Sequence, residues 1–203
     1  MVDSLMTLTG QLVKNGIRFR YLRASGKMQK PWAVSLEVTH RCIAKCIMCN
    51  IWRIPRDTPL LSADDWLALL SHDLFTDLVE LDITGGEPFL RSDLADLLTA
   101  VCQLKKRHLA SLKSIAVTTN GFLTPRILDE SRKILLEARR EGIDLVMVCA
   151  MDAVGEVHDA VRRYPGGWRK VDQTIQGLKG LRADFSNLII GLKTTVLPVN
   201  VGQ

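Results

Sequence analysis

The sequence predicts an α/β protein built on a parallel sheet. Apolar runs of strand length, rich in β-branched residues, alternate along the chain with longer segments of helical period. Some of these runs, such as DLVMVCA at 144–150, are continuously apolar, as expected for strands that are covered on both faces. Because sequential parallel strands need long crossovers, helices are expected between them. This order fits an open doubly wound sheet or part of a (β/α) barrel, and periodicity alone does not decide between the two.

Five strands and four main helices are expected. The strands are predicted at 34–39, 78–84, 114–119, 144–150 and 188–196. The helices are predicted near 63–71, 93–107, 125–140 and 168–182. Ser62 and Asp65 match a capping box before the first helix. Ser92 is placed to cap the second helix, and Thr124 followed by Pro125 is typical of a helix start.

Composition indicates a globular protein. The chain is 47% hydrophobic and 24% charged, and it contains no apolar run that approaches the ~18 residues of a membrane span. No basic segment followed by an apolar stretch opens the chain, so a signal peptide is not expected. We therefore expect a cytoplasmic protein, in which clustered cysteines bind metal or do redox chemistry rather than form structural disulfides.

Residues 1–30 are expected to form a basic helical leader. No acidic residue lies between Asp3 and Glu37. The basic residues in this interval are Lys14, Arg18, Arg20, Arg23, Lys27 and Lys30. Such a segment could dock an anionic partner, such as a nucleic acid, a membrane surface or an acidic peptide, or it could be a solvated basic helix.

Three of the five cysteines lie within eight positions, directly after the first predicted strand. They are Cys42, Cys46 and Cys49, in the pattern C-x3-C-x2-C. Their closeness, with the charged Lys45 among them, argues against three ordinary core residues. Three thiolates on one loop suit a [4Fe–4S] cluster in which one iron stays open for another ligand.

A zinc site is the alternative for these thiols, and it needs a fourth ligand. His40 is close in the sequence. Cys102 falls in the middle of a predicted helix and Cys149 falls inside an apolar strand, so both are expected to be core residues. The residues alone leave iron and zinc open.

Further polar motifs follow the next three strands. They are Gly85, Gly86, Glu87 and Pro88 after the second strand, TTNG at 118–121 after the third, and Asp152 after the fourth. Each motif alone would be an ordinary turn or helix cap. The carboxyl ends of parallel strands meet at one edge, however, where α/β sheets and barrels build their active sites. One assembled site is therefore predicted at this edge.

The motifs CIAKCIMC, GGEP and TTNG, in this order after three successive strands, resemble those of the radical S-adenosylmethionine (SAM) superfamily. The resemblance runs from about residue 31 to residue 200 and is closest to the group that contains molybdenum-cofactor biosynthesis enzymes and SPASM-like peptide maturases. It implies a partial (β/α)6 barrel with the cluster in the loop after the first strand. Five strands are present and the sixth is missing, so residues 31–203 are expected to be a C-terminally incomplete core.

The resemblance also implies roles for individual residues. Cys42, Cys46 and Cys49 would bind the cluster and so take part in catalysis, and Met48 would shield the adenine side. The residues that would meet the methionine ammonium or shape its turn are Gly85, Gly86, Glu87 and Pro88. Asn120 and Asp152 would border the SAM pocket. Arg162 would face the SAM carboxylate or lie at the surface, and Ala150 stands where many relatives have a serine.

The function implied is that of an enzyme. The reduced cluster would cleave SAM, and the resulting 5′-deoxyadenosyl radical would take hydrogen from an unidentified substrate, with a preference for a peptide or protein. A one-electron donor such as a flavodoxin or ferredoxin is the partner implied. Two alternatives stay open: a non-catalytic iron–sulfur electron-transfer or binding module, and a zinc-stabilised interaction domain. Glu87 favours the enzyme, because an electron carrier has no use for an ammonium-binding carboxylate.

Overall fold

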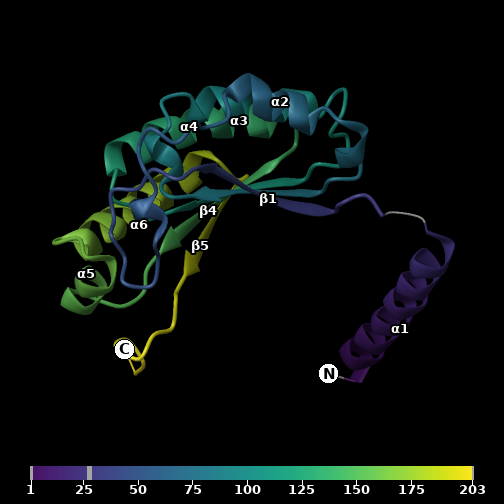
Figure 1. Cartoon of the computed structure of the whole chain (residues 1–203), viewed down its shortest axis with the longest axis horizontal. Coiled ribbons are helices and arrows are strands. Elements are labelled where there is room, and N and C mark those ends of the chain that lie inside the picture. The colour runs from purple at the N-terminus through teal and green to yellow at the C-terminus, as the bar shows by residue number, and fades with distance from the viewer. Residues whose placement is uncertain (1, 27–28, 203) are drawn as a thin grey trace.

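Five parallel strands form one curved sheet in the order β1-β2-β3-β4-β5 (Figure 1). The computed structural model describes residues 2–26 and 29–202, with residues 2–7 described by their backbone alone, so Lys27 of the leader lies outside it. The strands are β1 (Ala33–Thr39), β2 (Glu80–Gly85), β3 (Ser114–Thr119), β4 (Asp144–Ala150) and β5 (Leu188–Lys193). Since neighbouring strands are consecutive in the sequence, all their carboxyl ends lie at one edge, as predicted.

Helices connect these strands and pack on one face of the sheet (Figure 1). They are α2 (Ala63–Leu70), α3 (Leu94–Leu104), α4 (Thr124–Arg140), α5 (Glu156–Arg162) and α6 (Gly167–Asp184). Short 3-10 turns are η1 (Ile51–Arg53), η2 (Asp73–Phe75) and η3 (Pro88–Leu90). Alternate side chains of the central strands, among them Ile83, Ile115 and Leu145, are fully buried against this helical layer. The core therefore holds the strand ends rigidly.

The opposite face of the sheet is partly open. Val146 and Val148 of β4 are only half-buried on this face, and Ser35 Oγ donates a hydrogen bond to Asp82 Oδ2 at 2.6 Å across β1 and β2. The continuous apolar run of β4 therefore does not reflect cover on both faces within the described residues. This face is the concave inside of a partial barrel rather than the second buried side of a doubly wound sheet.

Several element boundaries differ from the expectation. Strand β5 ends at Lys193 instead of residue 196, because Asn200 Nδ2 donates to the carbonyl oxygens of Asp152 and Thr195 and folds the chain into a turn. The predicted cap by Ser92 is wrong, since Asp93 is the N-cap residue of α3 and its carboxylate binds Arg91 instead.

The other helix starts give a mixed result. The capping box of Ser62 and Asp65 is present as predicted. Thr124 is the first residue of α4, where its hydroxyl bonds to Thr174 Oγ1 at 2.7 Å instead of capping the helix. Helix α5 was not predicted, because it has only seven residues and no side chain caps its start.

The chain opens with helix α1 (Val2–Ser25), which lies apart from the sheet (Figure 1). Its described side chains are almost all exposed, including Leu12, Ile17 and Phe19. Among the described residues, no helix is both long and apolar enough to cross a membrane. The division into a leader at 1–30 and a core at 31–203 stays a prediction.

We expect Arg91→Ala to destabilise the fold. The Arg91 guanidinium is buried, and its Nη1 donates to the carbonyl oxygens of Val38 at 2.9 Å and Leu61 at 3.0 Å. Truncation removes both bonds and leaves the buried carbonyl of Val38 without this donor, at a cost of about 2–4 kcal/mol in the free energy of unfolding measured in urea. Arg132→Ala is the control, because its exposed ion pair with Asp184 at 3.9 Å is worth under about 1 kcal/mol. Equal losses in the two variants would contradict this assignment.

Candidate functional site

The loop after β1 carries the three cysteines and is held by backbone hydrogen bonds to the end of α5. The N–H of Lys45 donates to the carbonyl of Arg162 at 3.2 Å, and the N–H of Ile47 donates to that of Val161 at 2.9 Å. Segments more than a hundred residues apart thus fix one loop. A loop held in this way presents its side chains in a defined arrangement.

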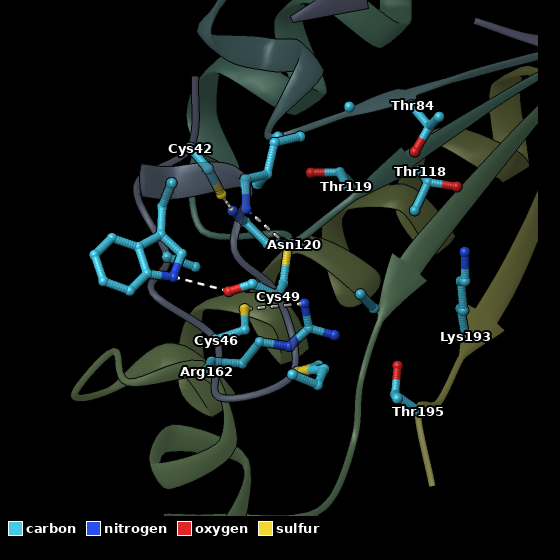
Figure 2. Close-up of a pocket in the computed structure, with 17 residues that line it drawn as sticks. Cys42, Cys46, Cys49, Thr84, Thr118, Thr119, Asn120, Arg162, Lys193 and Thr195 are labelled. Atoms are coloured by element: carbon cyan, nitrogen blue, oxygen red, sulfur yellow. Dashed lines mark hydrogen bonds between the residues drawn. The ribbon is translucent and has the colours of Figure 1, made fainter. Parts of the chain in front are cut away.

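All three cysteine sulfurs line one cavity of about 210 Å³ at the carboxyl edge of the sheet (Figure 2). Each sulfur accepts at least one N–H hydrogen bond. Asn120 Nδ2 lies 3.9 Å from the sulfur of Cys42, and Arg162 Nη1 lies 3.8 Å from the sulfur of Cys46. The N–H of Ile51 lies 3.5 Å from the sulfur of Cys49. These donors favour the thiolate form that binds metal.

Burial works against that form in the metal-free chain. It raises the pKa of Cys42 to about 11, with the nearby Glu87 carboxylate adding to the shift. Burial also raises the pKa of Cys46, although the Arg162 guanidinium opposes the shift. The Cys42 thiol is therefore protonated at neutral pH, and a metal must displace its proton to bind.

The turn after β2 packs directly against the cysteine loop through backbone atoms. The N–H of Gly86 donates to the carbonyl of Thr39 at 2.6 Å, and the N–H of Glu87 donates to that of Arg41 at 2.8 Å. A Cβ on Gly85 would collide with the carbonyl oxygen of Thr39, and one on Gly86 would collide with that of Arg41. Only glycines allow this approach, which sets both turns on the same cavity.

Glu87 is completely buried and does not itself line the cavity. Its carboxylate accepts hydrogen bonds from Thr119 Oγ1 at 2.8 Å, from the N–H of Asn120 at 2.8 Å and from the N–H of Phe89 at 3.3 Å. Burial raises its pKa to about 7 in spite of these three donors. Glu87 thus joins the ends of β2 and β3 and lies next to Asn120, which does line the cavity.

Asp152 and Arg162 form a buried ion pair, with Oδ2 and Nε 2.6 Å apart. Asp152 does not line the cavity, and its other oxygen accepts from the N–H of Thr195 at 2.9 Å. Arg162 does line the cavity and extends Nη1 to Cys46, so it is not a surface residue. Asp152 therefore orients Arg162, and both are fixed before any ligand binds.

The cavity gathers most of the predicted residues and adds some that sequence reasoning missed. The predicted residues on its walls are Cys42, Cys46, Met48, Cys49, Gly85, Gly86, Asn120 and Arg162. Pro88 is buried in η3 and lies outside the cavity lining, as do Glu87 and Asp152. Among the missed residues, Lys193 ends β5 and Thr195 follows it, and both lie across the cavity from the cysteines (Figure 2).

The donor set suits a cluster better than a single metal ion. Among the residues that the structure describes, no three His, Cys, Asp or Glu side chains gather closely enough to hold one ion. His40, the candidate fourth zinc ligand, is buried with its Nε2 unpaired. The thiolates of an iron–sulfur cluster bind separate irons and need not meet at one point. Three thiols that line one cavity fit such a cluster.

These features define a class: a partial (β/α) barrel with a three-thiol loop and a glycine turn on one cavity at its strand ends. A family model described as the Radical SAM superfamily matches residues 36–196. The chain therefore belongs to the radical SAM superfamily. Enzymes of this superfamily use a [4Fe–4S] cluster and SAM.

Similar curated proteins include a bacteriocin biosynthesis protein, a peptide cyclase and a GTP cyclase. The chain is 27% identical to the antilisterial bacteriocin subtilosin biosynthesis protein AlbA of Bacillus subtilis, over 75% of this chain and 31% of that protein. It is 38% identical to the PqqA peptide cyclase of Bradyrhizobium diazoefficiens, over 69% of this chain and 34% of that protein. It is 27% identical to the GTP 3′,8-cyclase of Limosilactobacillus fermentum, over 71% of this chain and 40% of that protein. The chain thus spans between three and four tenths of their length.

A solved structure supports the fold. The structure described as "Native anSMEcpe with bound AdoMet and Cp18Cys peptide" matches with a TM-score of 0.58 at 18% identity, over 79% of this chain and 41% of that one. At this identity the likeness concerns the fold alone. It confirms the predicted partial barrel with five parallel strands in one open sheet.

We expect Gly86→Ala to push the cysteine loop away from the turn after β2. The new methyl group would meet the Arg41 carbonyl, which belongs to backbone and cannot rotate away. The free energy of unfolding should fall by roughly 1–3 kcal/mol, and less iron should bind on reconstitution. Gly180→Ala is the control, because nothing lies within 4 Å of the place on α6 that its methyl group would take. A normal iron content in Gly86→Ala would contradict this account.

We expect the metal-free chain to lose stability as the pH rises from about 4.5 to about 7. In this range the folded chain holds a proton on Glu87 that the unfolded chain has released, so the slope of stability against pH is negative. The contribution of this group is on the order of 3 kcal/mol. Urea unfolding of wild type and Glu87→Gln across this range isolates it. Parallel pH curves would show that Glu87 does not titrate here.

Proposed function

We propose that this chain is the core of a radical SAM enzyme that binds a [4Fe–4S] cluster through Cys42, Cys46 and Cys49. One observation carries the proposal: the three sulfurs share a single cavity with Gly85–Gly86, and each already receives an N–H hydrogen bond. When bound, the reduced cluster supplies the electron that cleaves SAM to methionine and a 5′-deoxyadenosyl radical. The work of the protein is binding, orientation and exclusion of water.

Arg162 has two roles in this proposal. Its Nη1 hydrogen bond stabilises the Cys46 thiolate, and its positive charge lies on the cavity wall where the carboxylate of SAM would be held. The ion pair with Asp152 keeps the guanidinium in this position. We therefore assign Asp152 a positioning role rather than direct contact with SAM.

The glycine turn would take the amino end of SAM. Gly85 and Gly86 bring backbone close to the cavity, and the carboxylate of Glu87 lies just behind them. An ammonium group bound there would favour the ionised form of Glu87. SAM affinity is therefore expected to rise with pH through about 7, while Pro88 holds the turn in η3.

The adenosine part of SAM would occupy the rest of the cavity. Met48 and Ala150 give it an apolar wall, and Asn120 offers an amide beside Cys42. Ala150 has no hydroxyl for the ribose. Thr118, at the end of β3, also lines the cavity and offers such a group.

For the substrate we propose a peptide or protein. This choice is supported by relatives whose names describe peptide cyclisation and bacteriocin biosynthesis.

The electron would come from a one-electron donor such as a flavodoxin or ferredoxin. We place the protein in the cytoplasm because all five of its cysteines are free. We also retain the proposal that the basic leader at 1–30 docks an anionic partner beside the core at 31–203.

The proposal predicts that iron and sulfide, added anaerobically, form a cluster that dithionite reduces and that cleaves SAM to 5′-deoxyadenosine. Cys46→Ala should lose the cluster absorbance and at least about 100-fold of the cleavage rate, because a thiolate ligand is gone. Cys102→Ala is the matched control, since Cys102 is buried in α3 away from the cavity. The product is measured by chromatography. An intact cluster that never yields 5′-deoxyadenosine would refute the enzymatic assignment.

A further inference from the structure

The outer side of the cysteine loop is strongly basic. Arg41, Lys45, Arg53 and Arg56 are exposed, and residues 38–56 contain no aspartate or glutamate. None of the four forms a salt bridge with any residue in the described part of the chain. We propose that this surface docks an acidic one-electron carrier protein, which delivers the electron to the cluster through Trp52 and Cys42.

The docking surface contains a hollow of about 560 Å³ that we call the basic groove. Its walls include Arg41, Cys42, Lys45, Trp52, Ile54 and Arg56. Cys42 and Trp52 also line the inner cavity, so the groove and the proposed cluster site share these two residues as a common wall. A carrier seated in the groove would contact this wall from the outside. Electron transfer falls steeply with distance, so this shared wall is a suitable point of entry.

Trp52 is held in place at this wall. Its Nε1 donates to the carbonyl oxygen of Cys49 at 2.9 Å. Lys45 Nζ lies 5.7 Å and Arg53 Cζ lies 5.1 Å from the centroid of its ring. An aromatic ring flanked by cations and fixed to a cluster-ligand backbone has both a surface contact and a defined position beside the cluster.

The composition of the surface favours an acidic redox protein as occupant. Unpaired cations steer an anionic partner and set its orientation. Ile54 lines the groove and is 37% exposed, and Ile47 of the same loop is 45% exposed, so both offer apolar contact near the cations. A substrate is a poorer fit, because Gly85, Gly86 and Ala150 line only the inner cavity. A substrate in the groove would face the back of the cysteine loop instead of SAM.

The transfer balances with a flavodoxin as donor. The anionic flavin hydroquinone loses one electron and becomes the neutral semiquinone, while the cluster gains that electron and passes from the 2+ to the 1+ state. No proton moves in this step. The inference rests on the proposed function, since an electron carrier has a role here only if a cluster is bound.

The test measures how an acidic flavodoxin binds the chain with its reconstituted cluster. Arg41→Glu/Arg56→Glu should weaken the Kd at low salt at least about tenfold and reduce the rate of cluster reduction by flavodoxin hydroquinone to a similar degree. Lys179→Glu/Arg182→Glu on α6 makes the same change of charge on exposed residues outside the groove, and its Kd should stay within about twofold of wild type. Dithionite should reduce all three proteins equally fast.

Four outcomes decide between the docking surface and its alternatives. A selective loss in the groove variant, which disappears at high salt, supports the docking surface. Equal affinities for the two double variants overturn it, as does displacement of flavodoxin by a short oligonucleotide or acidic peptide at lower concentration than flavodoxin itself needs. A cluster that dithionite cannot reduce refutes the proposed function instead, and the Kd, which needs no turnover, still decides the surface.

Discussion

The site depends on the contact of two backbone segments at the ends of β1 and β2. Gly86 donates to Thr39 and Glu87 donates to Arg41, and at Gly85 and Gly86 no side chain larger than hydrogen fits. This contact brings the thiol loop and the carboxylate turn to one cavity without any side chain between them. Because it is made of backbone, it holds both segments at a fixed distance while leaving the cysteine side chains free to point inward.

The same architecture buries charge at a cost to stability. Glu87 has its pKa raised to about 7 by burial, and the thiol of Cys42 has its pKa raised to about 11. Asp152 and Arg162 offset each other, but neither is solvated. A bound cation near Glu87 and a metal on the thiols would each stabilise the charged form of their group. The metal-free chain therefore has its binding groups already in place, and this arrangement lowers its stability. Ligand binding can restore that stability.

The sequence could predict that these motifs meet at one edge of the sheet, because the edge follows from the order of the elements and hydrophobic periodicity predicts that order. It could not say which polar strand-end residues line the cavity. Glu87 accepts a hydrogen bond from Thr119 and Asp152 forms an ion pair with Arg162, instead of lining the cavity. These contacts depend on how the chain folds around the site, which the sequence pattern does not show. Lys193 was hidden for a simpler reason. The fifth strand was predicted to run on to residue 196, so Lys193, which ends the strand in the structure, was expected inside it.

The positive and negative side chains around the cavity lie on different sides, an arrangement that complements the two charges of a free amino acid. Lys193 and Arg162 line its walls, while Glu87 lies behind the glycine turn. A zwitterion placed between them would have its carboxylate toward the cations and its ammonium toward the buried acid. The methionine part of SAM is such a zwitterion, and a peptide-bonded residue is not. Under the proposed function, this polarity would favour the free amino acid end of SAM beside Arg162 and the glycine turn, and would leave the open concave face of the sheet for the substrate.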